Sequence, residues 1–181
     1  MTGAAHVSVL GVFGMILVYT GNGKGKTSAC VGQAVRAHGQ GLRVAFGQFM
    51  KRPGQAGEQR VLENLLPGAF MACGRGFFRK EEDRPEQREA AQELLRWAEE
   101  RMPHCDMLVL DEVLYAFGNG LVTRQELEGL IAMARELDVH LVLSGRGLPD
   151  WLRAEADLVT EMGEVKHPHQ QGVKAGKGIE F

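Results

Sequence analysis

The sequence predicts an α/β fold of one domain, in which helices cover both faces of a doubly wound, mostly parallel sheet. Short apolar runs alternate with helical stretches along the whole chain, which is the pattern of strands joined by crossover helices. Most of these runs are continuous rather than alternating, which indicates strands that are buried on both faces. Neither a linker nor an internal repeat interrupts the 181 residues, so a single domain over residues 1–181 is expected.

The expected elements follow one another in a regular order. The apolar run 15–19 is the first strand, and a glycine-rich turn leads from it into a helix over 26–38 that the glycines 39 and 41 end. Further strands are expected at 43–49, 70–72, 107–111, 140–144 and 158–161, and further helices at 58–66, 85–102 and 123–137. Apolar residues recur on one face of the helix 85–102. Thr123 and Glu126 have the spacing of a capping box, which places the start of the helix 123–137.

Composition excludes several classes of protein. Lys and Arg number 21 and Asp and Glu 23, giving a net charge of −2, whereas a dedicated nucleic-acid binder usually has a strong basic excess. The three cysteines, Cys30, Cys73 and Cys105, are scattered, so we expect buried thiols rather than disulfides or a zinc site. The apolar run 7–18 contains two glycines, lacks a basic leader and is too short to cross a bilayer. We therefore expect a cytoplasmic protein without nucleic-acid or membrane partners.

The turn between the first strand and the first helix has the residues of a phosphate-binding loop. It consists of Gly21, Asn22, Gly23, Lys24, Gly25, Lys26, Thr27 and Ser28. Glycines let successive backbone N–H groups face a polyphosphate, and the start of the following helix adds its free donors and its dipole. Lys26 supplies a positive charge, and the Thr27 hydroxyl is placed to reach Mg²⁺. Thr20 stands where the usual pattern has its first glycine, yet the context predicts a P-loop NTPase-like fold that binds a nucleotide.

Two acids, Asp111 and Glu112, follow the apolar strand 107–111. A strand that ends in this way resembles a Walker B motif, which brings carboxylates beside the nucleotide's Mg²⁺. The pair alone would equally fit a solvated turn, but together with the phosphate loop it favours a metal role. These two motifs predict nucleotide binding and leave the reaction open.

Further motifs carry a family resemblance, and they occur in a fixed order along the chain. They are the stretch from Val18 to Thr27, Gln48-Phe-Met-Lys51, Gly57-Glu58, Leu110-Asp-Glu112, Ser144-Gly-Arg146, the stretch from Ala156 to Met162, Lys166-His167 and the terminal Gly178-Ile-Glu-Phe181. Together they closely resemble the P-loop ATP:corrinoid adenosyltransferases, which act on cob(I)alamin or cob(I)yrinic acid a,c-diamide. The resemblance covers residues 14–181 and includes the shortened phosphate loop.

The resemblance implies a transferase that moves an alkyl group. Co(I) of a corrinoid attacks the 5′ carbon of ATP, a cobalt–carbon bond forms and triphosphate leaves. Lys26 and Glu112 are the implied catalytic residues, with Thr27 and Glu112 as Mg²⁺ ligands and no general base required. Arg146 and His167 are expected beside the nucleotide together with the loop. The resemblance also implies a homodimer and a partner that supplies electrons, a flavoprotein-type reductase.

The resemblance further implies a site for the corrinoid's lower face. Members pack aromatic side chains under the corrin, which removes the axial ligand and makes Co(II) easier to reduce. Phe77 matches the family phenylalanine, but Arg79 stands where a tryptophan is expected, so Phe78 is the candidate replacement. Glu58 matches the family's Gly-Glu pair and is assigned to the corrinoid on that ground.

Two other functions fit part of the sequence. A P-loop ATPase or kinase would explain the phosphate loop and the Asp-Glu pair, and an escort protein would bind corrinoid and use ATP only as a switch. The product separates the three, because only a transferase releases triphosphate together with adenosylated corrinoid. Three questions stay open from the sequence: whether the acceptor is cobalamin or a precursor, which reductant serves the enzyme, and the oligomeric state.

Overall fold

Six parallel strands form the sheet in the computed structural model, which describes residues 14–76 and 81–180. Their order across the sheet is β3-β2-β4-β5-β1-β6, and every strand pair is parallel. The predicted α/β class is therefore confirmed, and over the described residues the sheet is parallel throughout. A single domain over residues 1–181 stays a prediction for the chain as a whole.

The strands are β1 (Ile16–Thr20), β2 (Val44–Gln48), β3 (Phe70–Ala72), β4 (Met107–Asp111), β5 (His140–Ser144) and β6 (Leu158–Glu161). The helices are α1 (Lys26–Gly39), α2 (Gly57–Leu65), α3 (Arg84–Arg101), α4 (Val113–Gly118), α5 (Arg124–Glu136) and α6 (Asp150–Glu155), with short 3₁₀ turns η1 (Glu81–Asp83), η2 (Met102–His104) and η3 (Pro168–Gln171). The predicted elements are all present, with ends that differ by a residue or so. The helices α4 and α6 were not predicted, because six residues are too few to show a helical period.

The predicted capping box at the start of α5 is confirmed. The backbone N–H of Glu126 donates to Thr123 Oγ1 at 3.2 Å, and the backbone N–H of Thr123 donates to Glu126 Oε2 at 2.7 Å. Two backbone donors that lack a partner within the helix are satisfied in this way. The pair fixes where α5 begins.

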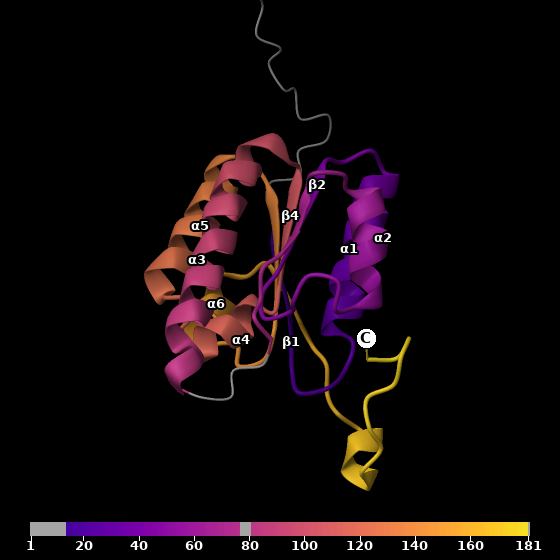
Figure 1. Cartoon of the computed structure of the whole chain (residues 1–181). Coiled ribbons are helices and arrows are strands. Elements are labelled where there is room, and N and C mark those ends of the chain that lie inside the picture. The colour runs from indigo at the N-terminus through magenta and orange to yellow at the C-terminus, as the bar shows by residue number, and fades with distance from the viewer. Residues whose placement is uncertain (1–13, 77–80, 181) are drawn as a thin grey trace, which may run out of the picture.

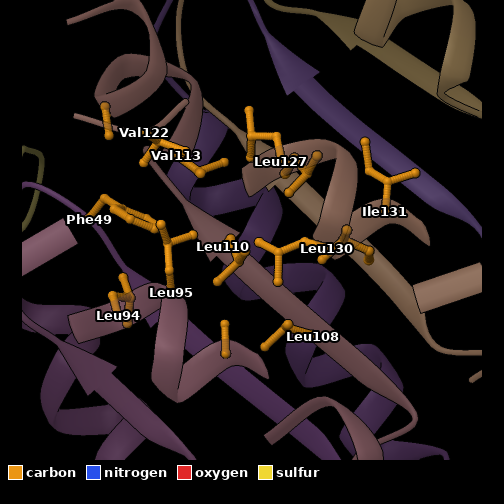
Figure 2. Packing of buried hydrophobic residues seen from close by; sticks show 14 of the residues in the cluster. Phe49, Leu94, Leu95, Leu108, Leu110, Val113, Val122, Leu127, Leu130 and Ile131 are labelled. Carbon is orange, nitrogen blue, oxygen red and sulfur yellow. The ribbon is translucent and has the colours of Figure 1, made fainter. Parts of the chain in front are cut away.

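Helices cover the sheet on both sides. Figure 1 shows α1 and α2 on one face and α3, α4, α5 and α6 on the other. Each face has its own cluster of buried apolar side chains, as expected for strands that are apolar on both sides. Figure 2 shows the larger cluster, where Leu110 of β4 lies between Leu95 of α3 and Leu130 of α5.

The cysteines lie within this packing. Cys30, Cys73 and Cys105 are all buried free thiols, as predicted. Burial raises the pKa of the Cys73 thiol to about 12 and that of Cys105 to about 11, so both stay protonated near neutral pH. None of the described helices is long and apolar enough to cross a membrane.

The topology brings polar residues together at one edge of the sheet. Because every strand is parallel, all the carboxyl ends lie on the same side. Three buried polar residues stand there at the ends of neighbouring strands: Gln48 of β2, Asp111 of β4 and Ser144 of β5. Ligands of open α/β sheets bind at this edge.

Candidate active site

A cavity of about 1040 Å³ opens at the carboxyl edge of the sheet. Its lining comes from the glycine loop and the start of α1, from the chain between β2 and α2 with the start of α2, from the start of α4, from the chain after β5, and from the C-terminal segment. Lining residues include Asn22, Gly23, Lys24, Gly25, Lys26, Thr27, Ser28, Lys51, Glu58, Glu112, Tyr115, Arg146, His167 and Glu180. Figure 1 shows the C-terminal segment, in yellow, beside the ends of α1 and α2 that border this edge.

Close packing with the chain after β6 explains two of the loop glycines. The N–H of Gly23 donates to the carbonyl of Met162 at 2.8 Å. A Cβ on Gly21 would lie 2.4 Å from that same carbonyl oxygen, and Gly21 also has a φ of 102°. The loop is therefore held against residue 162, and larger side chains are excluded from its inner side.

The first turn of α1 suits an anion. Gly25 precedes the helix with a φ of 119°, and the turn carries no acidic residue. The free N–H groups and the positive end of the helix dipole at this point attract phosphate. The structure thus supports the predicted phosphate loop.

Lys26 lies folded over the loop. Its ammonium donates to the carbonyls of Gly21 at 2.9 Å and Gly23 at 2.8 Å, and only 6% of the residue is exposed. Burial lowers the pKa of Lys26, although the negative charge of Glu112 opposes that change. The positive charge is held within the loop by backbone oxygens, at the position where phosphates would be bound.

Asp111 is the fully buried centre of a hydrogen-bond network. Ser144 Oγ donates to its Oδ1 atom at 2.7 Å. Its Oδ2 atom accepts from Thr27 Oγ1 at 3.1 Å and from Gln48 Nε2 at 3.2 Å. This one carboxylate joins four elements, α1, β2, β4 and β5. Its hydrogen bonds also provide the partners that a buried charged group needs.

Lys51 adds a second cation to the site. Its Nζ atom lies 2.8 Å from Glu58 Oε1, 3.4 Å from Asp111 Oδ2 and 3.2 Å from Thr27 Oγ1. Burial alone would lower the pKa of Lys51, but the Asp111 charge and the Glu58 hydrogen bond outweigh burial and raise it. The lysine is therefore firmly protonated. Gln59 Nε2 supports the group by donating to Gln48 Oε1 at 2.9 Å.

Glu112 lines the cavity and has an uncommon backbone conformation. Its φ is 61°, and its N–H donates to Ser144 Oγ at 3.0 Å, so one buried hydroxyl positions both acids of the pair. Burial raises the pKa of Glu112, and the neighbouring Asp111 charge adds to that rise. A buried carboxylate with a raised pKa favours a nearby cation, which fits a metal-binding role.

Most of the predicted site residues come together in the cavity. Arg146 reaches the loop, where its Nη2 atom donates to the carbonyl of Asn22 at 3.2 Å, and His167 belongs to the same lining. Glu58 also lines the cavity, where its Oε1 atom accepts hydrogen bonds from Lys51 and Gln48. Phe77 and Phe78, predicted for the corrinoid, lie outside the described residues.

Sequence reasoning missed the residues that connect the site. Gln48, Lys51 and Ser144 occur in the sequence motifs but were not predicted as site residues. Each of them donates a hydrogen bond to the Asp111 carboxylate. A usable signal existed, because all three stand at or just after the end of a strand.

Comparison with known proteins is consistent with this geometry. Residues 13–181 match the family model described as ATP:corrinoid adenosyltransferase BtuR/CobO/CobP. A corrinoid adenosyltransferase of Pseudomonas aeruginosa is 36% identical over 175 residues, covering 93% of this chain and 84% of the relative. Corrinoid adenosyltransferase CobA of Salmonella typhimurium is 34% identical over 172 residues, covering 93% and 86%.

A solved structure shows the same fold in a distant protein. The flagellar accessory protein FlaH of Methanocaldococcus jannaschii superposes with a TM-score of 0.56 at 12% identity, over 82% of this chain and 71% of that one. At this identity the likeness concerns the fold alone. The family model and the relatives cover nearly the whole chain, which belongs to the ATP:corrinoid adenosyltransferase family.

Proposed function

We propose that this protein transfers the 5′-deoxyadenosyl group of ATP to the Co(I) of a corrinoid and releases triphosphate. Family membership supports the activity. The observation that carries it in the structure is a cavity of about 1040 Å³, whose lining includes both the glycine loop with Lys26 and Glu112. That volume lies at the upper end of the range for ligand pockets, and it suits a large substrate.

The chemistry assigns charge stabilisation to the residues of this cavity. Two electrons of Co(I) form the new bond to the 5′ carbon. The bond between that carbon and the phosphate oxygen breaks, and its electron pair stays on the oxygen. Negative charge therefore accumulates on the leaving triphosphate, where the loop N–H groups and Lys26 are placed to stabilise it. Attack on carbon moves no proton, so neither Asp111 nor Glu112 is needed as a base.

The donor set at the strand ends fits Mg²⁺ held jointly with phosphate. A hydroxyl, Thr27, and two carboxylates, Asp111 and Glu112, supply the oxygen ligands that this ion prefers. Within residues 14–76 and 81–180, no group of three or more His, Cys, Asp or Glu residues forms a metal site by itself. Mg²⁺ held by these residues would supply neutralising charge to the triphosphate.

Several finer assignments belong to the same proposal. Arg146 and His167 contact the nucleotide, because both line the cavity and Arg146 also bonds to the loop at Asn22. Phe77, Phe78 and Glu58 serve the corrinoid side. A flavoprotein-type reductase supplies electrons to a cytoplasmic homodimer, as the family resemblance implies.

An anaerobic assay tests the proposed function. Chemically reduced cobalamin, ATP and Mg²⁺ are incubated with the protein, and both products are followed. We expect one triphosphate for each adenosylated corrinoid. Release of phosphate without adenosylation would instead identify an ATPase, and binding of both substrates without any product would identify an escort protein.

Phe77 is expected to affect Co(II) corrinoid more than Co(I) corrinoid. An aromatic wall acts by excluding the axial ligand, which is needed before reduction and not after it. Phe77→Ala should lose the spectroscopic signature of four-coordinate Co(II) and fail in a reductase-coupled assay, yet retain much of its rate with chemically reduced Co(I). Phe78→Ala should show the same pattern more weakly. Normal four-coordinate Co(II) in both variants would place the corrin's lower face elsewhere.

A further inference from the structure

The ammonium of Lys51 lies among oxygen atoms that come from three separate elements. These are Thr27 Oγ1 of α1 at 3.2 Å, Glu58 Oε1 of α2 at 2.8 Å and Asp111 Oδ2 of β4 at 3.4 Å. The side chain is only 23% exposed, and Asp111 is fully buried. The residues assigned to triphosphate and to Mg²⁺ do not include this lysine.

The backbone before Lys51 fixes where its side chain begins. Met50 has a φ of 64°, and the N–H of Lys51 donates to the carbonyl of Phe49 at 2.7 Å. A three-residue turn with positive φ is rare and strained. Gly74 packs against it so closely that a Cβ there would lie 2.0 Å from the carbonyl carbon of Met50. Strained turns persist where their surroundings hold them, and they often mark functional positions.

Lys51 and a divalent cation would compete for the same atoms. Thr27 and Asp111 are two of the residues proposed to hold Mg²⁺ with ATP. A buried carboxylate needs a positive partner, and Lys51 provides one. Two cations on the same oxygen atoms repel each other, so the ammonium has to leave Thr27 and Asp111 when the metal binds.

We propose that Lys51 is a resident counter-cation, which holds the oxygen atoms of Thr27, Glu58 and Asp111 together until Mg²⁺ enters with ATP and displaces it. The exchange keeps Asp111 neutralised at every stage. Because Lys51 lines the cavity, the displaced ammonium remains beside the bound nucleotide. The inference rests on the proposed function only in assuming that the metal arrives with ATP.

Binding of Mn²⁺, a paramagnetic substitute for Mg²⁺, tests the competition without ATP or corrinoid. The free ion is followed by electron paramagnetic resonance in the full-length wild type, in Lys51→Met and in Lys174→Met, which removes the same charge from an exposed lysine. Where Lys51 occupies the site for nine-tenths of the time, its removal raises the apparent Mn²⁺ affinity about tenfold. We expect that gain in Lys51→Met and not in Lys174→Met.

Two further variants locate the gained binding and guard against misfolding. Adding Thr27→Val to Lys51→Met should abolish the gain, and Glu58→Gln, which keeps the lysine but loosens it, should give a smaller gain. Thermal unfolding gives an independent readout: Lys51→Met should lose about 3 °C or more in EDTA and recover most of it in Mg²⁺. The wild type should unfold at the same temperature in both.

Equal Mn²⁺ affinity in Lys51→Met and the wild type would overturn the proposal. So would a gain that survives Thr27→Val, or a loss of thermal stability that Mg²⁺ does not repair. Neither ATP nor corrinoid takes part in these measurements. If these measurements contradict the competition, the proposed adenosyltransferase activity is not affected. If the wild type proves inactive, the competition between Lys51 and the metal can still be measured.

Discussion

Lys26→Ala should lower the rate of adenosylation by about 10²- to 10³-fold or more while the protein stays folded. The expected loss is large because the ammonium lies inside the glycine loop, within 3 Å of the carbonyls of Gly21 and Gly23. There it is placed to meet the charge that develops on the leaving triphosphate. Single-turnover rates with chemically reduced cobalamin, together with circular dichroism, measure both parts of the prediction.

Lys24→Ala is the matched control for this variant. Lys24 belongs to the same loop and lines the same cavity, but its side chain is exposed to solvent. Its removal should cost much less, because an exposed charge is screened by water. If folded Lys26→Ala adenosylates the corrinoid at a near-normal rate, the glycine loop does not bind the triphosphate as proposed.

Glu112→Gln should raise the concentration of Mg²⁺ that the reaction requires. An amide oxygen binds a divalent cation more weakly than a carboxylate does, and attack by Co(I) on carbon involves no proton that Glu112 would have to accept. The rate is measured against Mg²⁺ at several pH values. At saturating Mg²⁺ most of the rate should return, and the pH profile should keep its shape.

Because the pKa of Glu112 is raised, the Mg²⁺ requirement should also depend on pH. Burial and the Asp111 charge keep the carboxyl protonated to higher pH than usual, and a protonated carboxyl is a poor metal ligand. The wild type's requirement for Mg²⁺ should therefore grow as pH falls, and that of Glu112→Gln should change little. If Mg²⁺ restored nothing and the variant had instead lost a titrating base at saturating metal, Glu112 would not be a ligand.

The sequence predicted those parts of the site that depend on neighbouring residues. The glycine loop, Lys26 and Thr27 form one continuous stretch between a strand and a helix, so spacing alone identifies them. The strand β4 was clear for the same reason, since it consists of four apolar residues in a row followed by Asp111, and the structure buries all five. Local patterns were sufficient for these elements.

The connections between elements could not be read in this way. The Asp111 network joins residues that are 33 to 84 positions apart in sequence. Which of them meet depends on strand order, and the order places β4 between β2 and β5. The helix α4 was missed because it follows Glu112, a residue with positive φ and no side-chain cap, so the usual start signal is lacking.

The contact between Gly23 and Met162 links the loop to the edge of the sheet. All four residues of β6 are exposed, and edge strands of this kind open locally at small cost in free energy. When β6 opens, the N–H of Gly23 loses its acceptor and the loop loses its support. Bound nucleotide should therefore slow hydrogen exchange in β6. Substitutions in that strand should in turn alter nucleotide affinity through the free energy of local opening.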